Sequence, residues 1–294
     1  MDQAKRLRDL VKQRGVSPQV ELSKSSMRII SVTSGKGGVG KTNFALNLAI
    51  HLSKAGQRVI IVDADFGFAN VEVLLGLSPR YSFKEVLSGQ VSVADALTKG
   101  PAGLRFISGG SGLTQMSDVS DGQMGILLSG FQQLAELADI LIIDTGAGMS
   151  KAVTNFLKSS HEIIVVTTSD PTAIADAYSV MKAIAEGNEN PPTIKIVINR
   201  VENFKEGQDV YSRLYRVCTR FLKLKPEHLG SIPYDKFLVR SVKSQEPVAI
   251  LYPNSESSRC IEAISKRLLH NAAPPDESGL KQFLNRWVGF MKSQ

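Results

Sequence analysis

The fold is decided by the stretch SGKGGVGKT, residues 34–42, which lies between the apolar run Ile29–Thr33 and the helical pattern of Asn43–Ala55. Glycines in such a turn let the backbone aim several N–H groups at one anion, because glycine reaches conformations that other residues avoid. The N-terminus of the following helix adds its positive end. The order of strand, glycine-rich turn and helix therefore predicts a phosphate-binding loop.

The spacing of this loop matches the P-loop pattern G-x-x-x-x-G-K-[ST], with Gly35, Gly40, Lys41 and Thr42 in the fixed positions. Lys41 can reach the β- and γ-phosphates of a nucleotide, and the hydroxyl of Thr42 can bind Mg²⁺. We therefore expect the whole loop to bind a nucleotide, through Gly35, Lys36, Gly37, Gly38, Val39, Gly40, Lys41, Thr42 and Asn43.

Short apolar runs alternate with helical patterns along the rest of the chain. The expected strands are Ile29–Thr33, Arg58–Val62, Leu104–Ile107, Ile140–Ile143, Ile163–Thr167 and Ile194–Ile198. The expected helices include Asn43–Ala55, Gln123–Ala138, Thr172–Glu186 and Gln208–Leu222. This alternation predicts an α/β P-loop NTPase with a twisted, mostly parallel sheet of about seven or eight strands and helices on both faces.

Composition excludes several classes of protein. The 294 residues are 43% hydrophobic and 21% charged, as in ordinary globular chains and unlike disordered or collagenous ones. No apolar run reaches the length of a membrane-spanning helix, and Met1–Gly15 has no signal-peptide core, so we expect a cytoplasmic protein. The net charge of +7 is concentrated in residues 1–28 and 205–243, which indicates acidic partners.

Acidic residues follow two of the expected strands directly. Asp63 and Asp65 come after Arg58–Val62, and Asp144 comes after Ile140–Ile143. In parallel sheets of this kind ligands bind at the carboxyl ends of strands, so these carboxylates are expected beside the P-loop. Asp144 is a candidate Walker B residue, and we expect Thr42 and Asp144 to hold Mg²⁺, directly or, for Asp144, through water.

Lys36 adds a second lysine at the start of the loop, giving KGGVGKT at residues 36–42. This motif resembles that of the deviant Walker A ATPases, the MinD/ParA family, as does the stretch DADFGFANVEVLLGL at residues 63–77. The resemblance implies an ATP-dependent homodimer in which Lys36 crosses to the nucleotide of the partner subunit. It also implies that Asp63 lies near Mg²⁺, as a third metal-site residue. Asp65, by the same resemblance, orients or deprotonates the attacking water, so Lys36 and Asp65 are the expected catalytic residues.

Two further segments resemble the adenine-side elements of the same family. The pair Asn199-Arg200 ends an expected strand, and in the family such an asparagine contacts adenine through its amide. The loop GSIPYD, residues 230–235, resembles the second adenine-side loop, with Pro233 and Asp235 as expected contacts. No Asn-Lys-x-Asp motif is present, so the sequence favours ATP over GTP.

The chain begins with a short basic helical pattern, residues 1–14, joined by a polar linker, residues 15–26, to the body at 27–270. Its start resembles the N-terminal motif of the FlhG branch of this family, which regulates flagellar number and placement. The resemblance implies stimulation of FlhF, a GTPase of the signal-recognition-particle type, through Asp2, Gln3, Ala4, Leu7 and Arg8. It also implies basal-body and C-ring proteins as partners.

After a second linker, residues 271–278, the segment 279–294 has the pattern of a short amphipathic helix. Such a helix can lie in the headgroup region of a membrane, and the family carries a membrane-targeting helix at this place. The alternative is a terminal helix packed onto the body, and the two states can alternate. The apolar face, expected to bind the membrane, consists of Leu280, Phe283, Leu284, Trp287, Val288 and Met291.

The sequence thus favours an ATPase switch that dimerises on ATP, binds the inner face of the cell membrane reversibly and regulates flagella. The alternative is a ParA- or MinD-type ATPase that positions chromosomes or division sites; DNA binding, which the terminal helix disfavours, would use Lys205, Arg213, Arg216, Arg220, Lys223 and Lys225. A non-catalytic adaptor remains open as well. An iron–sulfur electron carrier is excluded, since Cys218 and Cys260 lie outside the required region.

Overall fold

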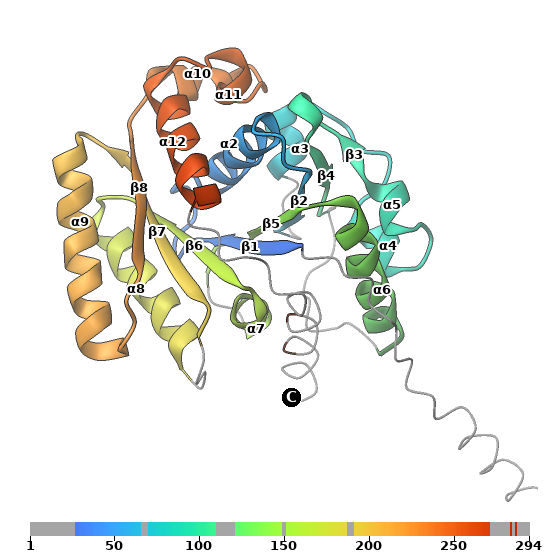
Figure 1. Cartoon of the computed structure of the whole chain (residues 1–294), viewed down its shortest axis with the longest axis horizontal. Coiled ribbons are helices and arrows are strands. Elements are labelled where there is room, and N and C mark those ends of the chain that lie inside the picture. The colour runs from blue at the N-terminus through green and yellow to red at the C-terminus, as the bar shows by residue number, and fades with distance from the viewer. Residues whose placement is uncertain are drawn as a thin grey trace, which may run out of the picture.

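The computed structural model describes residues 27–65, 70–109, 121–148, 151–186 and 191–270, together with Phe283 and Arg286. The described residues form one eight-stranded sheet with helices on both faces (Figure 1). Its strands are β1 (Arg28–Thr33), β2 (Val59–Ala64), β3 (Thr98–Lys99), β4 (Arg105–Ile107), β5 (Ile140–Thr145), β6 (Glu162–Thr167), β7 (Thr193–Val201) and β8 (Glu227–Pro233).

The strands lie in the order β3-β4-β2-β5-β1-β6-β7-β8, and every neighbouring pair is parallel except β3 and β4. β1 occupies a central position between β5 and β6. The chain adds strands on one side of β1 and then crosses to the other, which creates the switch point where parallel α/β sheets bind ligands. The carboxyl end of β1, where the P-loop begins, lies at this point.

Most of the helices that flank the sheet connect its strands, as parallel pairing requires, and the last three follow β8. They are α2 (Lys41–Lys54), α3 (Asn70–Leu75), α4 (Phe83–Leu87), α5 (Val93–Ala96), α6 (Asp121–Leu137), α7 (Lys151–Ser159), α8 (Pro171–Ala185), α9 (Phe204–Val217), α10 (Lys236–Lys243), α11 (Val248–Leu251) and α12 (Glu256–His270). A 3₁₀ turn at Pro101–Gly103 and a π-helical turn at Cys218–Leu222 complete the described elements.

Alternate residues of the central strands enter different cores. Ile30 and Val32 of β1 pack with α2 and α12 on one face, whereas Ile29 joins the cluster on the opposite face. On that second face α6 and α7 cover one half of the sheet, and α8 and α9 cover the other. Both faces of β1 are buried, which explains why the strand is almost continuously apolar.

The expected fold class is confirmed, including the helices on both faces and the mostly parallel sheet. All six expected strands are present, and their ends lie within three residues of the predicted bounds. β8 was not predicted, because its sequence EHLGSIP contains polar residues, glycine and proline instead of an apolar run. This strand pairs with one neighbour only, and an edge strand tolerates such residues.

The amino ends of the central strands are joined by a buried ionic cluster. Glu162, at the start of β6, accepts hydrogen bonds from the side chains of Arg28 and Lys195. Arg28 also donates to the carbonyl of Leu268 in α12, with a nitrogen–oxygen distance of 2.8 Å. The two cations lower the pKa of Glu162 against the opposing effect of its burial. The cluster therefore connects β1, β6, β7 and α12 at the end of the sheet opposite the P-loop.

Candidate nucleotide site

The glycine-rich loop, residues 34–40, joins β1 to α2 in a conformation that depends on glycine. The backbone angle φ is 77° at Gly38 and 92° at Gly40, in the left-handed region. A β-carbon at Gly35 would lie 2.3 Å from the backbone of Asp176 in α8, so no larger residue fits there. The loop consequently sits tightly against α8 and presents the N-terminus of α2, a geometry suited to anions.

Lys41, the first residue of α2, is buried and paired with a carboxylate. Its Nζ lies 2.6 Å from Oδ1 of Asp144 and 3.4 Å from the hydroxyl oxygen of Thr42. Burial raises the pKa of Asp144, and Lys41 opposes that rise. The structure thus brings together the three P-loop and Walker B side chains expected at the phosphates.

The second carboxylate oxygen of Asp144, Oδ2, is buried and has no hydrogen-bond partner among the described residues. Asp63 is the direct neighbour of Asp144 across the β2–β5 pair. Burial, followed by the charge of Asp144, raises the pKa of Asp63 to about 7. Two close carboxylates, an unpaired oxygen and the Thr42 hydroxyl are the donor set that Mg²⁺ prefers.

The residues present therefore fit Mg²⁺ in combination with phosphate oxygens. Within the described ranges no group of three or more His, Cys, Asp or Glu could hold a metal on its own. A P-loop cation normally takes one or two carboxylates and completes its shell with the nucleotide and water. The donors Thr42, Asp63 and Asp144 match that arrangement.

Asp63 also fixes the segment that follows β2. Its carboxylate accepts hydrogen bonds from the backbone N–H groups of Asp65, Asn70 and Val71, at 3.1, 2.8 and 3.1 Å. The last two donors lie at the start of α3. A ligand that competes for the Asp63 oxygens would therefore also act on the position of α3.

Asp65 lies at the rim of the same site and is half-buried. Its Oδ2 accepts a hydrogen bond of 3.3 Å from the side-chain amide of Asn70, and a β-carbon on Gly146 would approach its Oδ1 within 3.4 Å. The loop after β5 and the loop after β2 thus meet at this carboxylate. Asn70 is a neighbour that sequence reasoning missed.

Lys36 points to α8 within its own protomer. Its Nζ lies 2.8 Å from Oδ2 of Asp170 and 2.5 Å from the hydroxyl oxygen of Thr172. Lys36 and Asp170 are both about half exposed, with side-chain exposures of 42% and 47%. Neither Asp170 nor Thr172 was predicted as a site residue, although Asp-Pro at the start of a helix is a recognisable cap signal.

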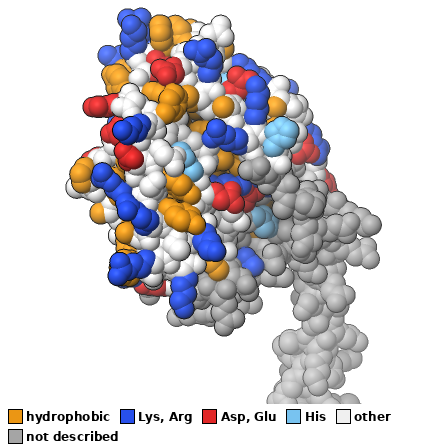
Figure 2. Space-filling model, turned by 60° about the vertical axis from the view of Figure 1, so that its left-hand side comes forward, with side chains coloured by type: hydrophobic (Ala, Val, Ile, Leu, Met, Phe, Trp, Pro, Cys, Tyr) orange, Lys and Arg blue, Asp and Glu red, His pale blue; other side chains and the backbone are white. Residues whose placement is uncertain are grey.

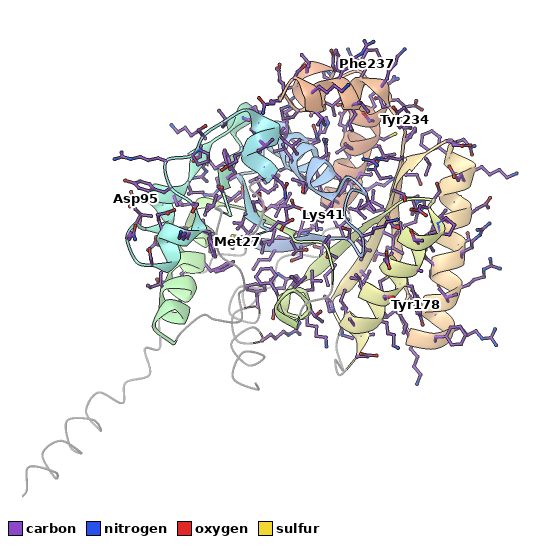
Figure 3. The ribbon with its side chains drawn as sticks, turned by 180° about the vertical axis from the view of Figure 1, so that it is seen from behind. Met27, Lys41, Asp95, Tyr178, Tyr234 and Phe237 are labelled. Atoms are coloured by element: carbon purple, nitrogen blue, oxygen red, sulfur yellow. The ribbon has the colours of Figure 1, made fainter. Side chains whose placement is uncertain are left out.

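A cavity of about 480 Å³ opens beside the P-loop at the ends of β7 and β8. The predicted residues Gly40, Asn43, Asn199, Arg200, Pro233 and Asp235 all line it. Sequence reasoning missed the wall contributed by α10, which consists of Leu238, Val239, Val242 and Lys243. Figure 3 shows Lys41 near the middle of the sheet, with Tyr234 and Phe237 displaced toward the α10 end.

Asn199 links this cavity to the phosphate loop. Its Nδ2 donates to the carbonyl of Val39 at 2.8 Å, and a β-carbon at Gly40 would lie only 2.4 Å from that nitrogen. Its neighbour Arg200 adopts a left-handed φ of 56° at an irregularity in the β7–β8 pairing and is exposed. Asn199 therefore supports the loop through its amide nitrogen as well as lining the cavity.

Asp235 caps two helices at the rim of the cavity. Its Oδ1 accepts the backbone N–H of Phe237 at 2.8 Å, and its Oδ2 accepts the N–H and hydroxyl of Ser257 at 3.0 and 2.7 Å. These hydrogen bonds lower the pKa of Asp235 against the opposing effect of burial. Both carboxylate oxygens thus have partners at the starts of α10 and α12.

The expected partner-binding residues Asp2, Gln3, Ala4, Leu7 and Arg8 lie outside the described residues, as do Leu280, Leu284, Trp287, Val288 and Met291. Phe283 is described, and its side chain is fully buried. Its ring centroid lies 5.5 Å from that of Phe131 in α6 and 5.3 Å from that of Phe156 in α7. At this residue the structure shows packing on the body, which is one of the two states considered for the terminal segment.

No helix in the described parts of the chain is both long and apolar enough to cross a membrane.

The cavity, the P-loop and the paired carboxylates lie together at one edge of the sheet, the edge formed by the carboxyl ends of its strands. This arrangement suits a nucleoside triphosphate, with its phosphates at Lys41 and its base in the cavity.

Comparison with known proteins agrees with this geometry. Residues 30–248 match the CobQ/CobB/MinD/ParA nucleotide binding domain. The antiactivator FleN of Pseudomonas aeruginosa is 34% identical, with 89% of this chain and 94% of FleN covered. The flagellum site-determining protein YlxH of Helicobacter pylori is 31% identical, with 92% of each chain covered.

Among solved structures, the MinC:MinD cell division protein complex of Aquifex aeolicus superposes with a TM-score of 0.67 at 25% identity. The match covers 85% of this chain and 98% of the solved one. The domain match extends over most of the chain and includes the P-loop, both acidic strand ends and the Asn199 region. The protein is therefore a member of the MinD/ParA family of nucleotide-binding proteins.

Proposed function

We propose that this protein is an ATP hydrolase that dimerises on ATP, binds membranes reversibly and regulates the number or placement of flagella. The observation that carries the hydrolase assignment is the pairing of Lys41 with Asp144, 2.6 Å apart, beside Asp63 and a buried carboxylate oxygen without a partner among the described residues. Such a site suits a cation beside the carboxylates of Asp63 and Asp144 and a phosphate beside Lys41, which together would balance the charges of these side chains.

In the proposed reaction the loop N–H groups and Lys41 hold the β- and γ-phosphates. Mg²⁺, when held by Thr42, Asp144 and Asp63, supplies positive charge against the phosphate oxygens. Asp65, which lies between the loops that follow β2 and β5, orients the attacking water. Lys36 of one protomer offsets the charge that develops at the nucleotide of the other.

The cavity at the ends of β7 and β8 accepts the base in this proposal. Its lining combines apolar side chains, among them Ile232, Leu238 and Val242, with the polar or charged ones of Asn43, Asn199, Arg200, Tyr234, Asp235 and Lys243. The carbonyl oxygen of the Asn199 side chain remains to accept from an exocyclic amine, since the amide nitrogen holds Val39. Adenine presents such an amine, so the arrangement is compatible with ATP.

The test of the catalytic proposal separates binding, dimerisation and hydrolysis. We expect calorimetry to detect ATP binding, and light scattering with a non-hydrolysable ATP analogue to give twice the monomer mass. Asp65→Ala should dimerise with ATP but not hydrolyse it, whereas Lys41→Ala should lose nucleotide binding. A protein that stays monomeric at saturating ATP, or an Asp65→Ala variant with normal turnover, would contradict the proposal.

We further propose that the terminal segment, residues 279–294, leaves the body and binds an anionic membrane surface in the ATP-bound dimer. Support comes from the position of Phe156, whose ring packs against Phe283. Phe156 lies in α7, the next helix in the chain after β5, the strand that carries Asp144. A structural change at Asp144 can therefore reach Phe156, and with it the packing of Phe283, through the short stretch of chain between β5 and α7.

The proposed role in flagellar regulation is supported by the relatives, whose names are antiactivator FleN and flagellum site-determining protein YlxH. The proposed partners are an FlhF-type GTPase, bound through Asp2, Gln3, Ala4, Leu7 and Arg8, and basal-body or C-ring proteins. We expect the full-length protein to accelerate GTP hydrolysis by FlhF and the Gln3→Ala variant to lose that effect while it retains ATP binding.

The second candidate is a positioning ATPase for chromosomes or division sites, and an exposed basic surface supports it. Figure 2 shows Lys and Arg side chains mixed with hydrophobic ones on the side of the molecule that carries α9, β8 and α10. The surface includes the exposed residues Lys205, Arg213, Arg216, Arg220, Lys223 and Lys225. DNA binding in the presence of ATP, weakening steeply as salt is added, would favour this second candidate. Membrane binding in the absence of DNA binding would favour the first candidate.

A further inference from the structure

The contact between Lys36 and the start of α8 consists of several hydrogen bonds that support one another. Nζ of Lys36 donates to Oδ2 of Asp170 and to the hydroxyl oxygen of Thr172. Thr172 is itself held by Asp170, which accepts its hydroxyl at 3.1 Å and its backbone N–H at 3.2 Å. Pro171 follows Asp170 at the first position of the helix. Lys36 therefore meets one carboxylate oxygen and one hydroxyl that are already oriented toward it.

Charge explains why Asp170 is required for this contact. The N-terminus of a helix carries partial positive charge and by itself repels a lysine. A carboxylate at the cap reverses the sign of the local field, and Lys36 in turn lowers the pKa of Asp170. Because Lys41 is paired with Asp144, each lysine of the loop has its own carboxylate.

The position of the site relative to the P-loop is fixed by packing. Gly35, the residue before Lys36, touches the backbone of Asp176 so closely that a β-carbon there would lie 2.3 Å from it. Asp176 lies in the second turn of α8, the helix that Asp170 caps. The loop and the carboxylate are thus held at one separation before any nucleotide binds.

We infer that Asp170 and Thr172 form a resting site that holds Lys36 within its own protomer and so competes with its transfer to the partner subunit. This inference rests on the proposed function, in which Lys36 acts across the dimer interface. Asp170 and Thr172 are positioning residues: they act through Lys36 and set how much protein is needed for the ATP-bound dimer to form. They do not touch the reacting atoms.

The expected size of the effect follows from the exposure of the pair. Exposed ion pairs of this kind change an equilibrium constant by about two- to fivefold. Formation of one dimer releases two such lysines, so the two contributions multiply. Loss of the resting site should therefore lower the dissociation constant of the ATP-bound dimer by about 4- to 25-fold. The effect should shrink at high salt, because exposed charges are screened.

The test uses Asp170→Asn, which removes the charge but keeps a residue that caps helices equally well. Thr172→Val is the second variant and removes the hydroxyl donor and acceptor. Asp139→Asn is the matched control, because it breaks the exposed ion pair of Arg58 and Asp139 at 2.6 Å without touching Lys36. The dissociation constant of the dimer is measured by sedimentation with a non-hydrolysable ATP analogue, at low and at high salt.

We expect Asp170→Asn to dimerise more tightly than the wild type at low salt, Thr172→Val to change in the same direction, and Asp139→Asn to match the wild type. The maximal hydrolysis rate per dimer should be unchanged in Asp170→Asn, while the protein concentration for half-maximal rate falls. An equal or weaker dimer in Asp170→Asn overturns the inference alone. A wild type that forms no dimer with ATP overturns the proposed function and the inference with it.

Discussion

The packing of Phe283 against Phe131 and Phe156 predicts a measurable link between the core of the body and membrane binding. The ring lies fully buried, with centroids 5.5 Å from Phe131 and 5.3 Å from Phe156. The perturbation is the double variant Phe131→Leu/Phe156→Leu, which leaves the terminal segment unchanged but removes these two rings. It weakens docking and also loosens the core to which both rings belong, so a second core variant serves as the control.

The magnitude follows from the two ring pairs. Each aromatic pair contributes about 0.5–1.5 kcal/mol beyond the burial of its area, so loss of both costs about 1–3 kcal/mol of docking free energy. Since 1.4 kcal/mol is tenfold, the ratio of docked to undocked protein should fall by about 5- to 150-fold. Burial of Phe283 against the leucines would remain and would keep part of the docking free energy.

The assay is sedimentation with anionic vesicles in the presence of ADP, of ATP and of no nucleotide. We expect the double variant to bind vesicles without ATP, whereas the wild type needs ATP. The matched control is Phe106→Leu, a buried aromatic residue of the core on the other face of the sheet. If the double variant kept the wild-type dependence on ATP, or if the control gained the same binding, docking of Phe283 would not restrain the segment.

Three further predictions concern stability. Burial, and after it the positive charge of Lys54, lowers the pKa of His51 to about 4. The contribution of neutral His51 to the free energy of unfolding is therefore fully present above pH 6.5 and is lost as the pH falls toward 4. We expect the free energy of unfolding to lose about 3 kcal/mol over that range through His51, and His51→Gln to show a flatter pH profile in urea titrations. Lys41→Met leaves the carboxylate of Asp144 buried without its cation, which should cost about 3–5 kcal/mol at neutral pH and less in acid, and a pH-independent loss in thermal unfolding would contradict this. Glu162→Gln leaves Lys195 buried without a carboxylate and should cost a similar amount, about 3–5 kcal/mol, while calorimetry shows the affinity for ATP unchanged; a weakened affinity would show that the cluster acts on the nucleotide site.

The parts of the site that could be predicted are those encoded by neighbours in the chain. The P-loop is continuous in sequence, and Asp63 and Asp144 follow apolar strands whose carboxyl ends must meet in a parallel sheet. The direct pairing of these two residues across β2 and β5 agrees with that expectation. Resemblance to the family is the source of the roles expected for Lys36, Asp65 and Asn199, which remain predictions.

The parts that could not be predicted depend on contacts between distant segments. Asp170 carries a clear helix-cap signal, but its pairing with Lys36 joins residues 134 positions apart. The α10 wall of the cavity follows from where α10 lies after β8 in the folded chain, and a hydrophobic periodicity does not reveal that position. For Phe283 the amphipathic pattern is the same whether the apolar face meets lipid or the rings of α6 and α7. Only the structure distinguishes these cases.

The ionic cluster at the amino ends of the strands fixes the start of β1. Arg28 is held there by Glu162, and the five other residues of β1 separate it from the P-loop, a distance of about 20 Å. The cluster and the nucleotide site therefore lie at opposite ends of β1, so a substitution at one end can leave the other end in place.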